Sequence, residues 1–316
     1  MRIFRYFAVI LAVALAAAAT PAGAGERLVG FMMKNNVDIN ERRTNEGVRG
    51  QLKAQQAAGK IDRFVEVDAE TDVQKQLNQI EDLLNMGVSV VIMAPAEAAG
   101  CAPILDRCRE ENIPIVIVCS KTTNTDDIAT AFVGSNDFEG GQMLARYAID
   151  KLPNGGNIFH LQGALGNSAA IDRTNGIHSI LDSQADKYPI KAELTGEWSR
   201  ERSIKIMEDW LQMYDVKDIN AVLCDNDDMA IAASLAAQAA DCDDQIYTIG
   251  FDAIDDALAL VKQGVLDATI KQDVAAQGVK AAEFAAMLAN GETVPRSHLI
   301  PFTLITGENI DEFYGK

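Results

Sequence analysis

The sequence is poor in the residues that hold metal ions and build disulfide scaffolds. Its 316 residues include three histidines and five cysteines, an odd number. No Cys-x-x-Cys pair and no histidine-rich cluster occurs. Cys101 and Cys108 fall on one predicted helix, roughly 10 Å apart along its axis, which is too far for a bridge. We therefore expect no metal site, no cofactor and no disulfide framework.

The chain also lacks the glycine-rich and nucleophile motifs of common enzymes. It contains no G-x-G-x-x-G, no G-x-x-x-x-G-K-[ST] and no G-x-S-x-G, so nucleotide binding and serine-hydrolase chemistry are not indicated. Positive charge is scarce, because 28 Lys and Arg stand against 46 Asp and Glu, for a formal net charge of −18. Such a surface repels phosphate backbones, so we expect no nucleic-acid binding and a soluble monomer.

The first 24 residues have the pattern of a signal peptide. Arg2 and Arg5 precede or flank an apolar run that starts at Phe7, and this run is shorter than the roughly 20 residues needed to span a bilayer. Small residues follow at positions 22–24, where a signal peptidase requires them. No cysteine lies nearby to carry a lipid. We therefore expect an exported protein, cleaved after Ala24.

Beyond this segment, short apolar runs alternate with stretches of helical period. Most runs are nearly continuous in Val, Ile and Leu, as strands covered on both faces are. Strands are predicted over residues 28–33, 64–67, 88–94, 115–119, 130–133, 157–161, 190–195, 221–224, 247–251 and 268–271. Helices are predicted over residues 46–58, 73–86, 99–111, 140–151, 168–182, 199–214, 228–240, 254–263 and 274–290.

The alternation predicts an α/β fold built from parallel sheets between helix layers. Two sheets of about five strands fit the length better than one sheet of about ten. No Gly/Ser-rich or Pro-rich linker separates two halves. We therefore predict two doubly wound lobes joined by short crossings inside the alternating pattern.

Polar side chains gather where the predicted strands end, which is where open parallel sheets bind ligands. Amides, carboxylates, an arginine and an aromatic follow seven of these strands and suit a ligand covered in hydroxyl groups. Some of these residues allow two interpretations. Asp225, Asp227 and Asp228 are either helix caps or a metal cluster, and Lys34 and Lys121 either face solvent or a pocket.

Four segments at these positions resemble the ribose-binding protein branch of the periplasmic sugar-binding proteins. They cover residues 161–176, 225–230, 249–252 and 268–272, and the resemblance extends over the whole mature chain. It implies the type I periplasmic binding fold, with two lobes, a three-segment hinge and a buried sugar that is delivered to an ABC-type permease. The implied crossings near residues 135, 272 and 301 give an N-terminal lobe of 25–135 plus 273–301 and a C-terminal lobe of 136–272 plus 302–316.

The resemblance also implies roles for six residues of the C-terminal lobe and hinge. Arg173 matches an arginine that forks onto sugar hydroxyls, and Trp198 replaces an aromatic that packs on the sugar. Asn226 matches an amide that binds a hydroxyl, and Phe251 a residue that stacks on the ring. Asp252 matches a carboxylate acceptor and Gln272 an amide on the hinge side. Guanidinium and carboxylate groups form charge-assisted bonds, and aromatic faces cover sugar C–H surface.

In the first lobe, this sequence departs from the family's pattern at the positions that contact the ligand. The family's Asp-Arg after the fourth strand reads Cys119-Ser120, its paired aromatics are replaced around Asn40, and Asp38 falls near its pocket amide. Asp38, Asn40 and Ser120 are therefore the candidate ligand residues on this side. Missing buried partners cost about 1–3 kcal/mol each, so the ligand is expected to be another pentose, a hexose or a polyol rather than ribose. A sugar acid becomes an alternative if Lys34 or Lys121 faces the cleft.

We therefore expect a periplasmic solute-binding protein of an ABC importer and not an enzyme, with a chemoreceptor as a compatible further partner. One alternative is an exported carbohydrate-acting enzyme, for which Asp252 and Asp225 are the only obvious carboxylate pair. Another is a transcription regulator with the same core. That regulator would need a basic helix-turn-helix before the first strand, where this chain carries the signal-peptide pattern.

Overall fold

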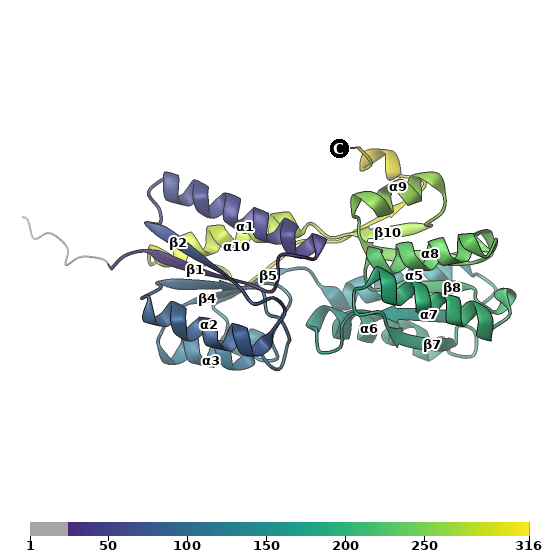
Figure 1. Cartoon of the computed structure of the whole chain (residues 1–316), viewed down its shortest axis with the longest axis horizontal. Helices are drawn as coiled ribbons and strands as arrows, with labels where there is room; N and C mark the ends of the chain where they lie inside the picture. The colour runs from purple at the N-terminus through teal and green to yellow at the C-terminus, as the bar shows by residue number, and fades with distance from the viewer. Residues whose placement is uncertain (1–24, 316) are drawn as a thin grey trace, which may run out of the picture.

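The computed structural model describes residues 25–315, which form two α/β lobes lying side by side along the long axis (Figure 1). The predicted signal peptide and its cleavage point after Ala24 lie outside the described residues. Each lobe holds one six-stranded sheet with helices on both faces. Between residues 25 and 315, no helix combines the length and the apolar character that crossing a membrane requires.

The first lobe is built on a wholly parallel sheet of order β11-β5-β4-β3-β1-β2. Its strands are β1 (Leu28–Met33), β2 (Arg63–Asp68), β3 (Val90–Met93), β4 (Ile115–Cys119), β5 (Ala131–Gly134) and β11 (Ser297–Leu299). Its helices are α1 (Ile39–Ala57), α2 (Val73–Asn85), α3 (Ala102–Glu110), the short α4 (Thr125–Ile128) and α10 (Val274–Ala289). Helices α1 and α10 pack together on one face, and α2 and α3 cover the other.

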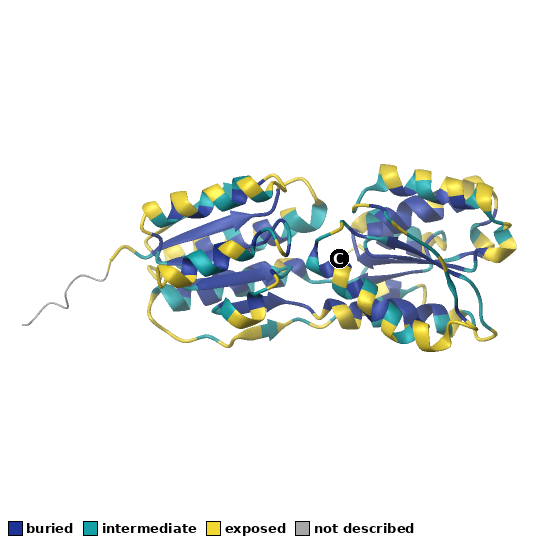
Figure 2. Ribbon diagram, turned by 90° about the horizontal axis from the view of Figure 1, so that it is seen from below, coloured by how far each residue is buried: buried dark blue, intermediate teal, exposed yellow. Residues whose placement is uncertain are grey.

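The second lobe repeats this order with strands β6 to β10 in place of β1 to β5. Its strands are β6 (Ile158–Gln162), β7 (Ile190–Thr195), β8 (Ala221–Cys224), β9 (Tyr247–Asp252), β10 (Ala268–Lys271) and the antiparallel β12 (Thr303–Thr306). Its helices are α5 (Asp137–Lys151), α6 (Ser168–Leu181), α7 (Arg200–Met213), α8 (Asp227–Ala239) and α9 (Asp255–Gln263). Helices α5 and α6 cover one face, and α7 and α8 the other. Figure 2 shows both sheets as buried layers inside partly exposed helices.

Three connections carry the chain between the lobes: β5 to α5, β10 to α10, and β11 to β12. The hydroxyl of Ser135, on the first connection, donates to the carbonyl oxygen of Ile300 on the third at 2.6 Å. The hydroxyl oxygen of Ser135 also accepts from Nε2 of Gln277, in the α10 turn that follows the second connection, at 2.9 Å. One buried side chain therefore ties all three connections together.

The paired helices in each lobe approach closely because glycine lies at their contacts. A Cβ added at Gly141 of α5 would collide with the backbone of Arg173 on α6, and one at Gly278 of α10 would collide with the backbone of α1 at Thr44. Both helix pairs carry residues of the cleft, so these glycines set how closely α6 approaches α5 and how closely α1 approaches α10.

Two expectations about the elements were wrong. The sheets have six strands each rather than about five, because β11 and β12 are three and four residues long and have no apolar run that would reveal them. Helix α1 begins at Ile39 rather than at Glu46. Its polar first turns resemble a loop, but Oδ1 of Asn35 accepts from the backbone N–H groups of Val37 and Asp38, both at 3.0 Å, and so directs the chain into the helix.

Candidate functional site

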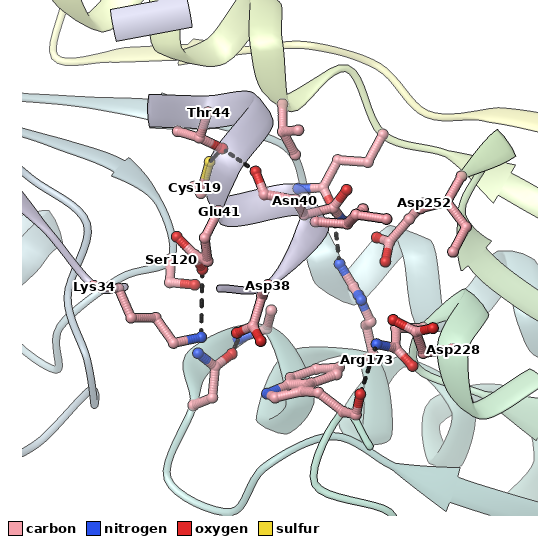
Figure 3. A pocket seen from close by; sticks show the side chains of 18 residues that line it. Lys34, Asp38, Asn40, Glu41, Thr44, Cys119, Ser120, Arg173, Asp228 and Asp252 are labelled. Atoms are coloured by element: carbon pink, nitrogen blue, oxygen red, sulfur yellow. Dashed lines mark hydrogen bonds and ion pairs between the residues drawn. The ribbon is translucent and has the colours of Figure 1, made fainter. Parts of the chain in front are cut away.

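A cavity of about 720 Å³, counting its open mouth, lies between the lobes at the carboxyl ends of the strands. Residues from both lobes and from one connection line it (Figure 3). Eight of the nine predicted site residues are among them: Asp38, Asn40, Ser120, Arg173, Trp198, Asn226, Asp252 and Gln272. The fold therefore brings residues as far apart in the chain as Asp38 and Gln272 to one cavity, at the strand ends where the sequence predicted them.

Arg173 is held on several sides by the protein itself. Its Nε and Nη2 atoms lie 3.0 and 2.8 Å from Oδ1 of Asp137, and Nη2 donates to Oε1 of Gln272 at 3.1 Å. Nη1 donates to the backbone carbonyl of Asp225. Every guanidinium nitrogen therefore already has a protein acceptor. These bonds fix the orientation of Arg173 in the cavity wall and leave it fewer donors for ligand hydroxyl groups.

Phe251 is the one predicted site residue that does not line the cavity. Its ring is fully buried and its centroid lies 3.6 Å from Cζ of Arg173. The reason is strand alternation: Phe251 faces the layer of α5 and α6, whereas the next residue, Asp252, ends the strand at the cavity. Stacking of Phe251 on the ligand therefore stays a prediction that this conformation does not support, because the ring lies behind Arg173 and not at the cavity.

Asp137, the ionic partner of Arg173, was missed by the sequence analysis. It lies in the first turn of α5, where an acidic residue ordinarily reads as a partner of the helix dipole. Here the carboxyl group is buried. Burial raises its pKa above the usual range, because the loss of water outweighs the attraction of Arg173. The pair therefore depends on both partners being present.

Asp225 does not line the cavity, but it holds the loop after β6 in place. Its Oδ2 accepts from the backbone N–H of Gly163 at 2.8 Å, and its Oδ1 lies 3.0 Å from Nε2 of His160. Nδ1 of His160 lies 2.9 Å from Oε2 of Glu193. Burial alone would lower the pKa of this histidine, but the two carboxylates raise it to about 9. His160 is therefore charged at neutral pH and bridges β7, β6 and β8.

The neighbouring aspartates bond to other elements of the lobe, while the cap of α8 is Asn226. Asp227 accepts from the Thr269 hydroxyl at 2.6 Å and from the backbone N–H of Ile254 at 2.9 Å. Asp228 lines the cavity and pairs with Arg200 at 2.7 Å. Within residues 25–315, no group of three or more His, Cys, Asp or Glu side chains is arranged to hold a metal ion.

Three residues that line the cavity hold a left-handed backbone conformation. Cys119, Trp198 and Asp252 have φ values of 64°, 62° and 121°, in a region that non-glycine residues rarely adopt. Cys119 and Asp252 are the last residues of β4 and β9, and Trp198 lies in the loop after β7. Such strain costs about 1–3 kcal/mol per residue and is concentrated at functional sites, so it marks this cavity independently of the side-chain chemistry.

Trp198 and Asn226 form a contiguous part of the second-lobe wall. Oδ1 of Asn226 caps α8 by accepting from the backbone N–H of Met229 at 3.0 Å, and its Nδ2 donates to the carbonyl of Trp198 at 3.4 Å. The indole Nε1 of Trp198 is buried without a hydrogen-bond partner in the described residues. A ligand acceptor at that point would satisfy it.

The first-lobe wall comes from the early turns of α1 and the end of β4. Lys34 lines the cavity, with Nζ 3.3 Å from Oε1 of Glu41, and both side chains are largely buried. Oγ1 of Thr44 lies 3.4 Å from Sγ of Cys119, whose thiol pKa is raised by burial. Glu41 and Thr44 were not predicted, because the early start of α1 was missed.

Lys121, the other lysine considered at the sequence level, points elsewhere: its Nζ pairs with Asp126 at 2.8 Å, and it does not line the cavity. Its backbone N–H instead reaches the second lobe, donating to Oγ of Ser168 at 2.7 Å.

Further contacts join the two sides of the cleft. The backbone N–H of Ala98 donates to the carbonyl of Gly166 at 3.0 Å, and Arg43 pairs with Asp255 at 3.1 Å. Ile39, at the start of α1, packs against the apolar core of the second lobe. The described conformation is therefore one in which the lobes touch across the cavity.

Comparisons with known proteins match both lobes. Residues 29–293 match the family described as a periplasmic binding protein domain. A Rhizobium meliloti protein named as rhizopine-binding is 35% identical over 253 residues, which is 79% of this chain and 81% of that protein. The ribose import binding protein of Bacillus subtilis (strain 168) is 31% identical over 244 residues, which is 77% of each chain.

A solved structure gives the same result in three dimensions. An ABC transporter solute binding protein from Bacillus halodurans C-125, with bound myo-inositol, has a TM-score of 0.85 and 31% identity to this chain. The match covers 92% of this chain and 98% of that one, so the likeness extends over both sheets and the three connections.

Proposed function

This chain belongs to the periplasmic binding protein family, and we propose that it captures one monosaccharide or polyol between its lobes and delivers it to an ABC-type permease. The observation that carries this proposal is the shared cavity, which is lined by polar residues of both lobes and by Gln272 of a connection. A ligand held there touches both halves at once. Relatives that are named for ribose import or were crystallised with myo-inositol support the ligand class.

The proposed mechanism is hinge closure. A ligand that contacts both lobes stabilises the closed form, because an open form cannot offer both sets of contacts. Shifting such an equilibrium decisively requires roughly 5 kcal/mol of differential binding. A few charge-assisted bonds and one covered ring face supply energy of that order. The closed surface is then what the permease recognises.

The roles of individual residues follow from the geometry. We assign the apolar face of the ligand to Trp198 and its hydroxyl groups to Asn40, Asp38, Asn226 and Asp252. Arg173 and Gln272, which are bonded to each other, form the hinge-side wall. Ser120 stands where the resemblance implies an arginine, and its shorter side chain offers one donor in place of a guanidinium. This difference favours a ligand other than ribose, and we propose a hexose or a cyclic or linear polyol.

We propose that the protein binds its ligand without transforming it. The enzyme alternative relied on Asp252 acting together with Asp225. Asp225 is fully buried, bonded to His160 and to Gly163, and absent from the cavity wall. Incubating the protein with a bound sugar or polyol and recovering that compound unchanged is the expected outcome, and conversion of the compound would overturn this part of the proposal.

We also propose that the chain is exported, cleaved after Ala24, and monomeric. Its lobes comprise residues 25–135 plus 273–301 and residues 136–272 plus 302–316. A chemoreceptor that recognises the same closed form is a compatible further partner. N-terminal sequencing of the periplasmic protein tests the cleavage point, because a mature chain would begin at Gly25.

A thermal-shift screen of neutral sugars, polyols and sugar acids tests the ligand class, since a compound that binds only the folded state raises the melting temperature. Intrinsic fluorescence gives a second signal, because Trp198 lines the cavity and Trp210, the other tryptophan, is buried in the core of the second lobe. A neutral sugar or polyol is expected to stabilise the protein and alter the Trp198 emission. No response from any compound would refute the proposal.

A further inference from the structure

The cavity wall has an excess of carboxylates over cations. Its charged residues are Lys34, Asp38, Glu41, Arg173, Asp228 and Asp252, which makes four acidic groups against two basic ones. Whether this excess acts on a ligand depends on which of these charges are already neutralised by ion pairs within the protein.

Both cations are already paired with protein carboxylates. Nζ of Lys34 lies 3.3 Å from Glu41, and Arg173 is paired with Asp137, outside the lining, at 2.8 Å. Among the acidic groups, Glu41 is neutralised by Lys34, and Asp228 by Arg200 at 2.7 Å. No cation of the cavity wall is left over for an acidic ligand.

Asp38 and Asp252 are the carboxylates that remain. Neither forms an ion pair with a side chain of residues 25–315, and the Asp38 carboxylate accepts only from the amide of Asn35, at 2.9 Å. Asp252 is 8% exposed, and burial raises its pKa well above the usual range, because the attraction of Arg173 does not replace the lost water. Figure 3 shows both carboxyl groups turned toward the space between the lobes.

Without a cation beside it, the buried carboxyl group of Asp252 favours its neutral, protonated form, and a cation brought to this point would favour the charged carboxylate. We propose that the ligand itself supplies this cation: a polyol or sugar that carries a protonated amine, held at Asp252 from the second lobe with Asp38 facing it from the first. This inference rests on the proposed function and narrows its ligand class. The ammonium group would donate charge-assisted hydrogen bonds, which are about twice as strong as those of a neutral hydroxyl.

The same charges oppose a sugar acid. Lys34 does face the cleft, which was the condition for that alternative, but its ammonium is occupied by Glu41. A ligand carboxylate would meet Asp38 and Asp252 with no free cation nearby. The expected order of affinity is therefore amine above neutral parent above acid.

Isothermal titration calorimetry with matched ligands tests this order. The panel consists of inositols and hexoses, their derivatives with one hydroxyl replaced by an amine at successive positions, and the corresponding sugar acids. At neutral pH, at least one amine is expected to bind about tenfold or more tightly than its parent, and the advantage should disappear above the pKa of the amine. If a parent binds at least as tightly as every amine derived from it, this inference is wrong while the proposed function stands. If no compound binds, both fail.

Two variants locate the effect. Asp252→Asn keeps the shape of the side chain and removes its charge, so the preference for the amine should fall to about parity while the neutral parent loses less affinity. Asp256→Asn removes a charge of the same lobe that pairs with Arg200 outside the cavity wall, and should leave the preference within about twofold. A preference that survives Asp252→Asn, or disappears in Asp256→Asn, would contradict the assignment.

Discussion

The guanidinium of Arg173 lies over the ring of Phe251, with Cζ 3.6 Å from the ring centroid. A cation over an aromatic face is attracted by the ring's quadrupole, by about 2 kcal/mol or more where water is excluded. The contact orients a cavity residue from its buried side. It also changes what substitutions at either position are expected to do.

Phe251→Leu is expected to weaken ligand binding about five- to tenfold without any direct loss of ligand contact, because Arg173 loses the face that holds it. The cost in stability should be about 1–1.5 kcal/mol. Calorimetry and thermal unfolding measure the two effects. Phe302→Leu is the control: Phe302 packs edge-on against Phe251 at 4.8 Å, so its loss should lower stability with little change in affinity. Equal losses of affinity in both variants would contradict the orienting role.

Arg173→Met is expected to abolish binding and also to destabilise the fold. Arg173 is a partner of Asp137 as well as a cavity residue, so its removal leaves Asp137 buried without a partner, which costs about 3 kcal/mol at neutral pH. The loss should be smaller at low pH, where Asp137 takes up a proton. Adding Asp137→Asn should restore the free energy of unfolding without restoring binding. Chemical denaturation at two pH values measures this, and a double variant no more stable than the single one would refute it.

His160 predicts a loss of stability at alkaline pH. Its pKa is raised from 6.5 to about 9 in the folded protein, so the folded state holds a proton that the unfolded state releases. That stabilisation is complete below about pH 6.5 and is lost as the pH rises through about 9. Between pH 7.5 and 9, the free energy of unfolding should fall by up to about 2 kcal/mol from this group.

His160→Gln should be less stable at pH 7.5 and should lack this alkaline slope. His298→Gln removes a histidine that packs against Phe284 rather than against carboxylates, and should keep the slope. Urea denaturation at a series of pH values measures both. A slope of the same size in His160→Gln would show that another group titrates in this range.

Gly141→Ala is expected to lower both stability and affinity. The added methyl group would meet the backbone of Arg173, so α5 and α6 would have to separate and Arg173 would shift. Gly50→Ala is a matched control on α1, because a Cβ there meets no atom within 4 Å. It should stabilise the protein by about 0.5–1 kcal/mol through helix propensity. Thermal unfolding and calorimetry distinguish the two, and an unaffected Gly141→Ala variant would contradict the packing argument.

Much of the architecture could be predicted from local sequence. The continuous apolar runs at Ile115–Cys119 and Ala221–Cys224 define strands to the residue, because burial on both faces admits little else. The family and the fold class predicted from the sequence are confirmed. The edge strands were missed because they are short and pair with strands far away in the chain. The start of α1 was missed because its first turns are polar, although the local bonds of Asn35 direct the chain into the helix.

The position of the cavity could be predicted from the sequence, but the ion pairs among the residues around it could not. The rule that ligands bind beyond the strand ends placed Asp252 and Gln272 on one surface. It could not reveal that Asp137 pairs with Arg173, because that contact depends on how closely α5 and α6 approach. It also could not separate Lys34, which faces the cavity, from Lys121, which pairs with Asp126. Which way each lysine points depends on the carboxylate that pairs with it, Glu41 or Asp126.

The hydroxyl of Ser135, bonded to Ile300 and to Gln277, limits how the lobes can move. Three separate connections would permit twisting and sliding as well as bending. Because one hydroxyl joins all three, a movement of one connection is expected to carry the other two with it. The two lobes would then open and close as a unit, with the Ser135 junction as their shared pivot.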